Sequence, residues 1–88
     1  MKFRKKPVVI DAHLYTGDIE AAINWTYRLG NLDGKTFLDF NSLGELHVAT
    51  LEGSMKVPKG NYIICGIKGE LYSCEPNIFH MTYEEVND

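Results

Sequence analysis

The chain has 88 residues, of which 44% are hydrophobic and 24% are charged, and its net charge is −3. This length and composition are those of one small folded domain over residues 1–88, and they exclude a predominantly disordered chain. The negative balance argues against a general nucleic-acid-binding protein, because such proteins usually carry an excess of basic residues.

The elements at the start of the chain differ in their hydrophobic period. Residues 8–15 alternate with a period of two, which predicts a strand with one buried face. The expected buried positions are Val8, Ile10, Ala12 and Leu14. Residues 19–29 have the apolar spacing of an amphipathic helix, which either Thr16 or Asp18 can cap. We therefore expect a strand followed by a helix.

Turn signals recur at short intervals through the rest of the chain, which favours consecutive antiparallel strands. The predicted strands cover residues 35–40, 45–51, 54–57, 62–67 and 70–74, and the last two flank a hairpin loop at Lys68-Gly69. A single helical turn at residues 76–79 and a short strand at residues 80–84 complete the prediction. The fold class is therefore α+β: one helix in the N-terminal half, packed on a largely antiparallel sheet of about five to six short strands.

The two cysteines fall on this predicted hairpin. A two-residue loop at Lys68-Gly69 would place Cys65 opposite Tyr72, with Cys74 diagonal to it on the same face. Diagonal neighbours lie roughly 7–8 Å apart, which exceeds the usual Cα separation of a disulfide, about 4.4–6.8 Å. We expect two reduced thiols that pack in the core.

Three side chains are the best candidates for metal binding or catalysis. Asp11 and His13 share the predicted outward face of the first strand, and His47 joins them if its strand is adjacent. An ordinary solvated strand face explains the same pattern, and we favour that interpretation because no further ligand is fixed by spacing. We assign no catalytic residue, no metal site and no cofactor, and the pattern favours a protein that is not an enzyme.

Aromatic and basic residues are the candidates for binding. Ten aromatic side chains are many for so small a core, and four of the nine basic residues lie within the first six positions. Exposed tyrosine and tryptophan make good interface anchors, and a basic segment attracts an acidic partner. The alternative is that the aromatic residues fill the core and that the basic start is a solubilising tail. The candidate binding residues are Arg4, Lys6, Tyr15, Trp25, Tyr62 and Tyr72.

Two blocks of sequence resemble a set of small phage and prophage accessory proteins, most of which have no assigned activity. The first block is KFRKKPVVIDA, residues 2–12. The second comprises Leu51-Glu-Gly53, Gly60-Asn-Tyr-Ile-Ile64, Gly66-Ile-Lys-Gly-Glu70, Tyr72, Pro76, Phe79 and Tyr83-Glu84. The family typically has Pro-Gly-Asp before an aromatic residue, whereas this chain has Asn61 in place of the acid. The resemblance implies a viral origin and a protein that acts by binding, and no family site carries over to Asn61.

Three functions remain open on the sequence. The first is a phage-encoded accessory protein that binds a host protein, with inhibition of antiviral defence as the specific expectation. The second is an oligomeric sponge for a small ligand such as a nucleotide, with a pocket that uses Arg4, Lys6 or Lys56. The third is a small hydrolase or metal enzyme built on Asp11 and the two histidines His13 and His47.

The remaining expectations concern location and partners. No segment approaches the roughly 20 apolar residues of a membrane span, and no apolar run of a signal peptide follows the basic start. We expect a protein of the host cell cytoplasm without membrane contact. A host protein is the expected partner, nucleic acid is not expected, and a small ligand and a homo-oligomer are left open.

Overall fold

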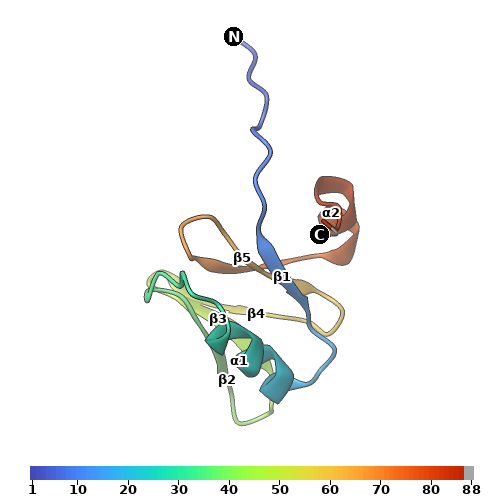
Figure 1. Ribbon diagram of the computed structural model, residues 1–88. Coiled ribbons are helices and arrows are strands. Elements are labelled where there is room, and N and C mark those ends of the chain that lie inside the picture. Colours follow the sequence, from blue (N-terminus) through green and yellow to red (C-terminus); the bar gives the residue numbers. More distant parts are fainter. Residues whose placement is uncertain (87–88) are drawn as a thin grey trace.

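The computed structural model describes residues 1–86, and within this range the chain forms six strands and two helices. The strands are β1 (Asp11–Leu14), β2 (Phe37–Phe40), β3 (Leu46–Thr50), β4 (Gly53–Lys56), β5 (Tyr62–Cys65) and β6 (Leu71–Cys74). The helices are α1 (Ile19–Tyr27) and α2 (Pro76–Thr82). The α+β class is confirmed, and Figure 1 shows the arrangement.

The strands form two sheets, whereas the sequence predicts one. Each sheet has three antiparallel strands, in the orders β1-β5-β6 and β2-β3-β4. After β4 the chain turns away from its hairpin partner and β5 pairs with β1, in a register that runs from Asp11↔Cys65 to Leu14↔Tyr62. This pairing joins positions about fifty residues apart, and no local pattern specifies such a contact.

The core lies between the two sheets and α1. The buried side chains of this cluster come from both sheets and from α1, namely Tyr15, Ala22, Leu46, Val48, Val57, Ile63, Cys65 and Leu71. Figure 1 shows α1 and the β2-β3-β4 sheet on one side of the β1-β5-β6 sheet, with α2 on the other side. The central strand β5 is therefore covered on both faces.

Helix α1 begins where the sequence predicts and ends two residues early. Asp18 is the N-cap residue, and its Oδ1 accepts a hydrogen bond of 3.0 Å from the backbone N–H of Ala21. This contact satisfies one of the backbone donors that a helix leaves free at its start. The buried positions Ala22 and Thr26 lie one turn apart, so that one stripe of the helix faces the core.

The burial around β1 differs from the prediction: Ala12 and His13 are both half-buried, and the buried side chain is that of Tyr15, directly after the strand. Tyr15 is only 5% exposed, whereas Val8 and Leu14 on the expected buried face are 44% and 45% exposed. The reason is that Tyr15 and His13 point toward α1 and the core. The other face of β1 lies on the side of the sheet where α2 packs and is covered only in part.

The β5–β6 hairpin differs from the prediction by one residue in register. Cys65 pairs with Leu71, and the backbone N–H of Gly66 donates to the carbonyl oxygen of Glu70 over 2.8 Å. A one-residue slip moves every later side chain to the other face. Cys65 and Cys74 are therefore on opposite faces of the sheet and both are free, and burial raises the pKa of the Cys65 thiol.

Gly69 explains the longer hairpin loop. Its φ is +81°, and a Cβ at this position would lie 1.8 Å from the carbonyl oxygen of Asn31. The backbone N–H of Asp33 donates to the carbonyl oxygen of Gly69 over 3.0 Å. The loop is thus shaped by its contact with the connector after α1, which favours glycine strongly.

The helical turn predicted at residues 76–79 continues to Thr82, into the segment where the sequence predicts a strand. Pro76 starts α2 at a position where its missing N–H costs nothing, and the helix continues to Thr82. The predicted strand at residues 80–84 is wrong because the segment packs against the sheet through aromatic rings rather than pairing with it. Neither helix in the part of the chain described is long and apolar enough to cross a membrane.

Candidate functional site

A cluster of aromatic rings fixes α2 to the face of the β1-β5-β6 sheet. Tyr62, at the start of β5, stacks on Phe79 of α2 with ring centroids 3.8 Å apart and planes 7° from parallel. His80 meets both rings edge-on, at centroid distances of 5.5 and 5.7 Å. Tyr83 lies one helical turn after Phe79, and its ring centroid is 5.1 Å from the Phe79 centroid. These contacts hold the short helix in one position.

A cleft of about 560 Å³ lies between α2 and the extended chain that leads into β1. Its lining residues come from the chain that leads into β1 and from α2 with the residues after it, two segments that Figure 1 shows near each other. Its lining residues are Val8, Val9, Ile10, Asp11, Ala12, Tyr62, Phe79, His80, Tyr83, Glu84, Glu85 and Val86. We call this hollow the α2 cleft. Its volume is in the range of sites that take small molecules or single side chains of a partner.

The acidic side chains at the α2 cleft come from Glu84 and Glu85, because the side chain of Asp11 shares the face of β1 that points toward α1. No lysine or arginine is among the lining residues in the described chain, although Lys5 lies over the ring of Tyr83 at the edge of the cleft. Carboxylates beside aromatic faces suit a cationic group, because a cation is attracted both by the negative charge and by the ring quadrupole. The lining of the α2 cleft therefore suits a cationic and partly apolar group.

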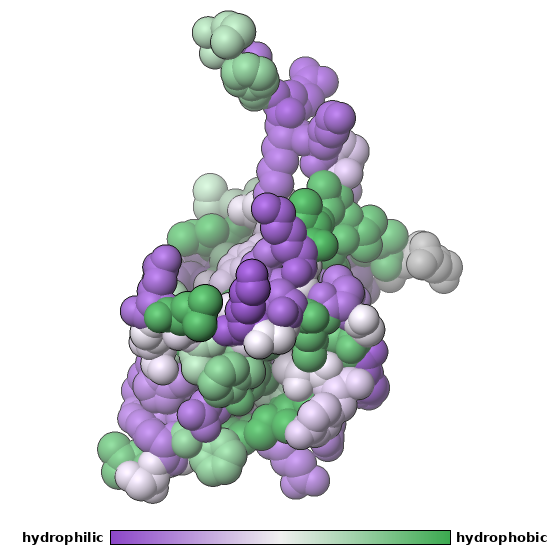
Figure 2. Space-filling model, turned by 90° about the vertical axis from the view of Figure 1, so that its left-hand side faces the viewer, coloured by the Kyte–Doolittle hydropathy of each residue, from purple (hydrophilic) through white to green (hydrophobic). Residues whose placement is uncertain are grey.

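Residues 1–10 form an extended segment outside every strand and helix, which we call the arm. Met1 and Phe3 are 110% and 87% exposed, so these apolar side chains gain nothing from the fold of their own chain. The Nζ of Lys5 lies 5.6 Å from the centroid of the Tyr83 ring. Figure 2 shows a mostly hydrophilic arm that rises above the body, with hydrophobic surface beside its base and at its tip.

A smaller hollow of about 160 Å³ lies on the other side of the base of the arm. Lys5, Tyr72 and Tyr83 are among its lining residues, and the two tyrosine hydroxyl oxygens are 3.4 Å apart. Burial, followed by the hydrogen bond with Tyr83, raises the pKa of Tyr72. The Tyr72 phenol therefore stays protonated at neutral pH and acts as a hydrogen-bonding group.

Four of the six predicted binding residues lie in this region. Tyr62 is in the floor of the α2 cleft, and Tyr72 lines the smaller hollow. Arg4 and Lys6 lie on the arm and are exposed. The structure thus brings the base of the basic segment and two of the predicted tyrosines to the same end of the molecule.

The other two predicted binding residues lie elsewhere. Tyr15 is buried in the core and is inaccessible to a ligand, which corrects the sequence prediction. Trp25 is half-buried on α1, and its ring stacks on His13 at a centroid distance of 5.4 Å. Both side chains contribute to packing, because α1 lies over the face of β1 that the sequence assigns to solvent.

The three metal candidates are not brought together. His13 faces Trp25. His47 lies on the face of β3 opposite to the buried Val48, and its Nε2 is 3.4 Å from Nδ2 of Asn41. Asp11 lies on the other sheet, two residues before His13. Within residues 1–86 no group of three or more His, Cys, Asp or Glu side chains could hold a metal ion. We therefore discard the enzyme built on these residues.

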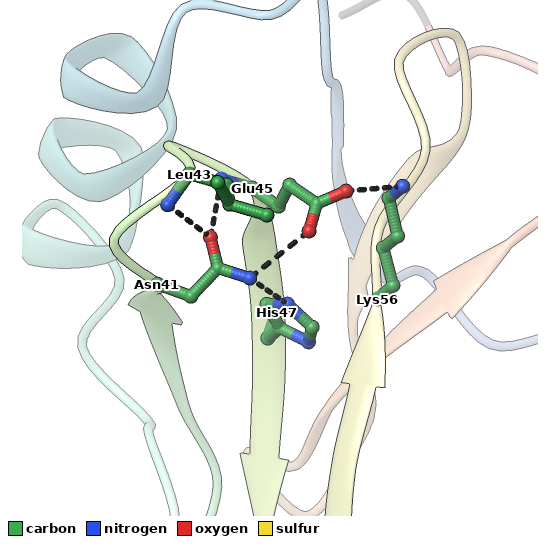
Figure 3. Close-up of polar contacts among 5 residues, drawn as sticks. All are labelled: Asn41, Leu43, Glu45, His47 and Lys56. Atoms are coloured by element: carbon green, nitrogen blue, oxygen red, sulfur yellow. Dashed lines mark hydrogen bonds and ion pairs between the residues drawn. The ribbon is translucent and has the colours of Figure 1, made fainter.

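The surroundings of His47 form a polar network on the β2-β3-β4 sheet (Figure 3). Asn41 Oδ1 accepts hydrogen bonds of 3.0 Å from the backbone N–H groups of Leu43 and Glu45. Asn41 Nδ2 donates to Glu45 Oε1, and Glu45 Oε2 lies 2.5 Å from Lys56 Nζ. The hydrogen bond from Lys56, with that from Asn41, lowers the pKa of Glu45. The network holds the β2–β3 loop, and Lys56 is occupied in it.

Sequence reasoning missed the second wall of the α2 cleft. Phe79 and Tyr83 are spaced four residues apart, which places them on one face of a helix. That spacing was the available signal, and the assignment of a strand to residues 80–84 concealed it. The acidic Glu84 and Glu85 that follow bring their charge to the cleft only because α2 folds back over the sheet.

No protein-family model matches this chain, and no curated protein or solved structure is similar enough to it to count as a match. Functional inference therefore depends on the chemistry of the α2 cleft and the arm. The cleft offers aromatic faces, carboxylates and one imidazole, and the arm offers cations and exposed apolar side chains. Such groups suit the recognition of another polypeptide.

Proposed function

We propose that this chain is a small phage accessory protein that binds a protein of the host cell, as an inhibitor of antiviral defence. The observation that carries the proposal is the α2 cleft, which has an aromatic floor and an acidic rim. The contact lies on the β1-β5-β6 sheet, where β1 is an edge strand. An edge strand beside a cleft is the arrangement by which extended peptides are recognised in many complexes.

The partner segment that fits is extended and cationic. Its backbone would pair along the free edge of β1, and a lysine or arginine side chain would enter the cleft beside Phe79 and Tyr83. There the carboxylates of Glu84 and Glu85 attract the charge while the rings contact the aliphatic stem. Such a contact combines backbone hydrogen bonds, which give affinity, with one pocket that selects a side chain.

The same charges disfavour a nucleotide sponge. A phosphate at the α2 cleft would meet Glu84 and Glu85 without a lysine or arginine in the cleft lining of the described chain. Lys56, one of the cations expected for such a pocket, pairs with Glu45 on the other sheet. Like charges at close range raise the free energy of binding, so the small-ligand alternative has less support than a protein partner.

The test is site-specific photo-crosslinking in host cells. A photoreactive phenylalanine analogue replaces Val86, which is 59% exposed and lines the α2 cleft. We expect one host protein to be captured covalently and identified by mass spectrometry. The same capture should be lost when Glu84→Lys and Glu85→Lys are added, because the attraction for a cationic segment becomes repulsion.

Tyr27 provides the matched control. It is 80% exposed on α1, away from the cleft, so the same analogue at this position reports random collisions. Capture of the same host protein from both positions, or of no host protein from position 86, would refute the proposal. Capture of a second copy of this chain alone would also refute it.

A further inference from the structure

The arm carries exposed charged and apolar side chains, of which Lys5 already lies over the Tyr83 ring of its own chain. Its cations Lys2, Arg4, Lys5 and Lys6 are four of the nine in the chain, and Phe3 is 87% exposed. Burial of the Phe3 ring and pairing of the cations on an acidic, partly apolar surface would be favourable. The arm is therefore suited to such a counterpart.

The α2 cleft has the complementary chemistry. Its rim carries Glu84 and Glu85, and its floor is the stacked pair of Tyr62 and Phe79. Basic side chains with an aromatic residue between them match carboxylates around aromatic faces. The arm and the cleft are thus a complementary pair encoded in one chain.

Geometry separates the tip of the arm from the cleft of its own chain. Residues 8–10 already form one wall of the cleft, and the chain before them runs away from the body (Figures 1 and 2). The molecule measures 46 Å along its longest axis and 25 Å along the other two. Lys5 still lies over the Tyr83 ring of its own chain, whereas the four residues before it, which include Phe3 and Arg4, extend beyond that contact by up to about 13 Å.

We propose that the arm of a second copy of this chain occupies the α2 cleft, so that two copies exchange arms reciprocally. The cleft lies at the base of the arm, so both are at the same end of the molecule. If these ends of two copies face each other across a twofold axis, each arm points toward the cleft of the other copy. The contact is isologous: each copy donates Phe3 and Arg4 and receives the same groups, so that the assembly closes as a dimer. The inference goes beyond the proposed function, because it needs no host protein, although a host segment would compete for the same cleft.

The test is a charge exchange read by sedimentation velocity and native mass spectrometry of the full chain. One variant carries Arg4→Glu and Lys6→Glu in the arm, and the other carries Glu84→Lys and Glu85→Lys at the cleft. We expect the wild type to be a dimer and each variant to have a dissociation constant at least about tenfold higher, because each arm meets a cleft of its own sign. Mixing the variants should restore dimers that contain one copy of each, because both contacts then join opposite charges.

Controls separate this outcome from general charge effects. Lys35→Glu with Lys68→Glu reverses two exposed cations outside the arm and should leave the dimer intact. Circular dichroism of each variant checks that the fold is retained. A wild type that is monomeric throughout a micromolar concentration series would overturn the inference, and so would a dimer that survives the arm variant. Absence of host capture from position 86 of the otherwise unchanged chain, with the dimer intact, would refute the proposed function alone.

Discussion

The central strands of the two sheets have different surroundings. In β5, Ile63 and Ile64 are both 0% exposed although they point to opposite faces. In β3, Leu46 and Val48 are 1% exposed, whereas His47 and Ala49 on the other face are only partly covered. The sequences show this difference, since β5 reads as a continuous apolar run and β3 alternates. The comparison locates the candidate site: the sheet with both faces covered carries α2, the α2 cleft and the arm.

The strongest test of this comparison is truncation on the outer face of each central strand. Ile64→Ala should reduce the free energy of unfolding by about 3 kcal/mol, because it removes a fully buried side chain beneath the side on which α2 packs. His47→Ala, at the matched outward position of β3, should cost less than about 1 kcal/mol. Urea denaturation of both variants measures the two values, and equal losses would show that the two outer faces do not differ.

The second prediction concerns the helix that covers the outer face. Phe79→Ala removes the stack on Tyr62 and should cost about 2 kcal/mol. Amide chemical shifts should change along β1, β5 and β6 and not in the other sheet. The control is Phe37→Ala, which truncates a 56% exposed ring on the outer face of the β2-β3-β4 sheet and should cost about 0.5 kcal/mol. Comparable losses would contradict a structural role for the aromatic stack.

A smaller effect depends on pH. Burial, with the charge of Arg28 nearby, lowers the pKa of His13 below its ordinary value of 6.5. His13 therefore binds a proton more readily in the unfolded chain than in the folded one. The stability that neutral His13 contributes is complete above pH 6.5 and declines as the pH falls below that value. His13→Gln should flatten the stability profile in that range, measured by urea denaturation with Trp25 fluorescence as the probe. His80→Gln serves as the comparison, and an unchanged profile in the His13 variant would contradict the assignment.

The smallest effect is expected on the polar face of the β2-β3-β4 sheet. Lys56→Met breaks the ion pair with Glu45, in which the two side chains are 55% and 33% exposed. Exposed pairs contribute little, so the midpoint of urea denaturation should equal that of the wild type within error. Carboxyl chemical shifts should report a higher pKa for Glu45, since its main hydrogen-bond donor is lost. A marked loss of stability would show that the polar face of the β2-β3-β4 sheet contributes more to the free energy of unfolding than its exposure to solvent predicts.

The sequence by itself determined the local elements. The α+β class, a helix capped by Thr16 or Asp18 and the positions of most strands follow from hydrophobic period, capping and turn residues, which act over a few neighbouring positions. These inferences succeeded because each depends on contacts that the chain makes with itself at short range. The sequence also indicated Tyr62, Tyr72 and the basic arm as candidates for binding, and that role stays a prediction.

Only the tertiary structure decided how the elements combine. The division into two sheets follows from the pairing of β1 with β5, and the register at Cys65 follows from the contact between Gly69 and the connector after α1. The burial of Tyr15 and the separation of His13 from His47 depend on where α1 packs. The α2 cleft needs the two ends of the chain side by side. Such contacts between distant positions leave no periodic trace in the sequence, because their free energy is gained only when the whole chain folds.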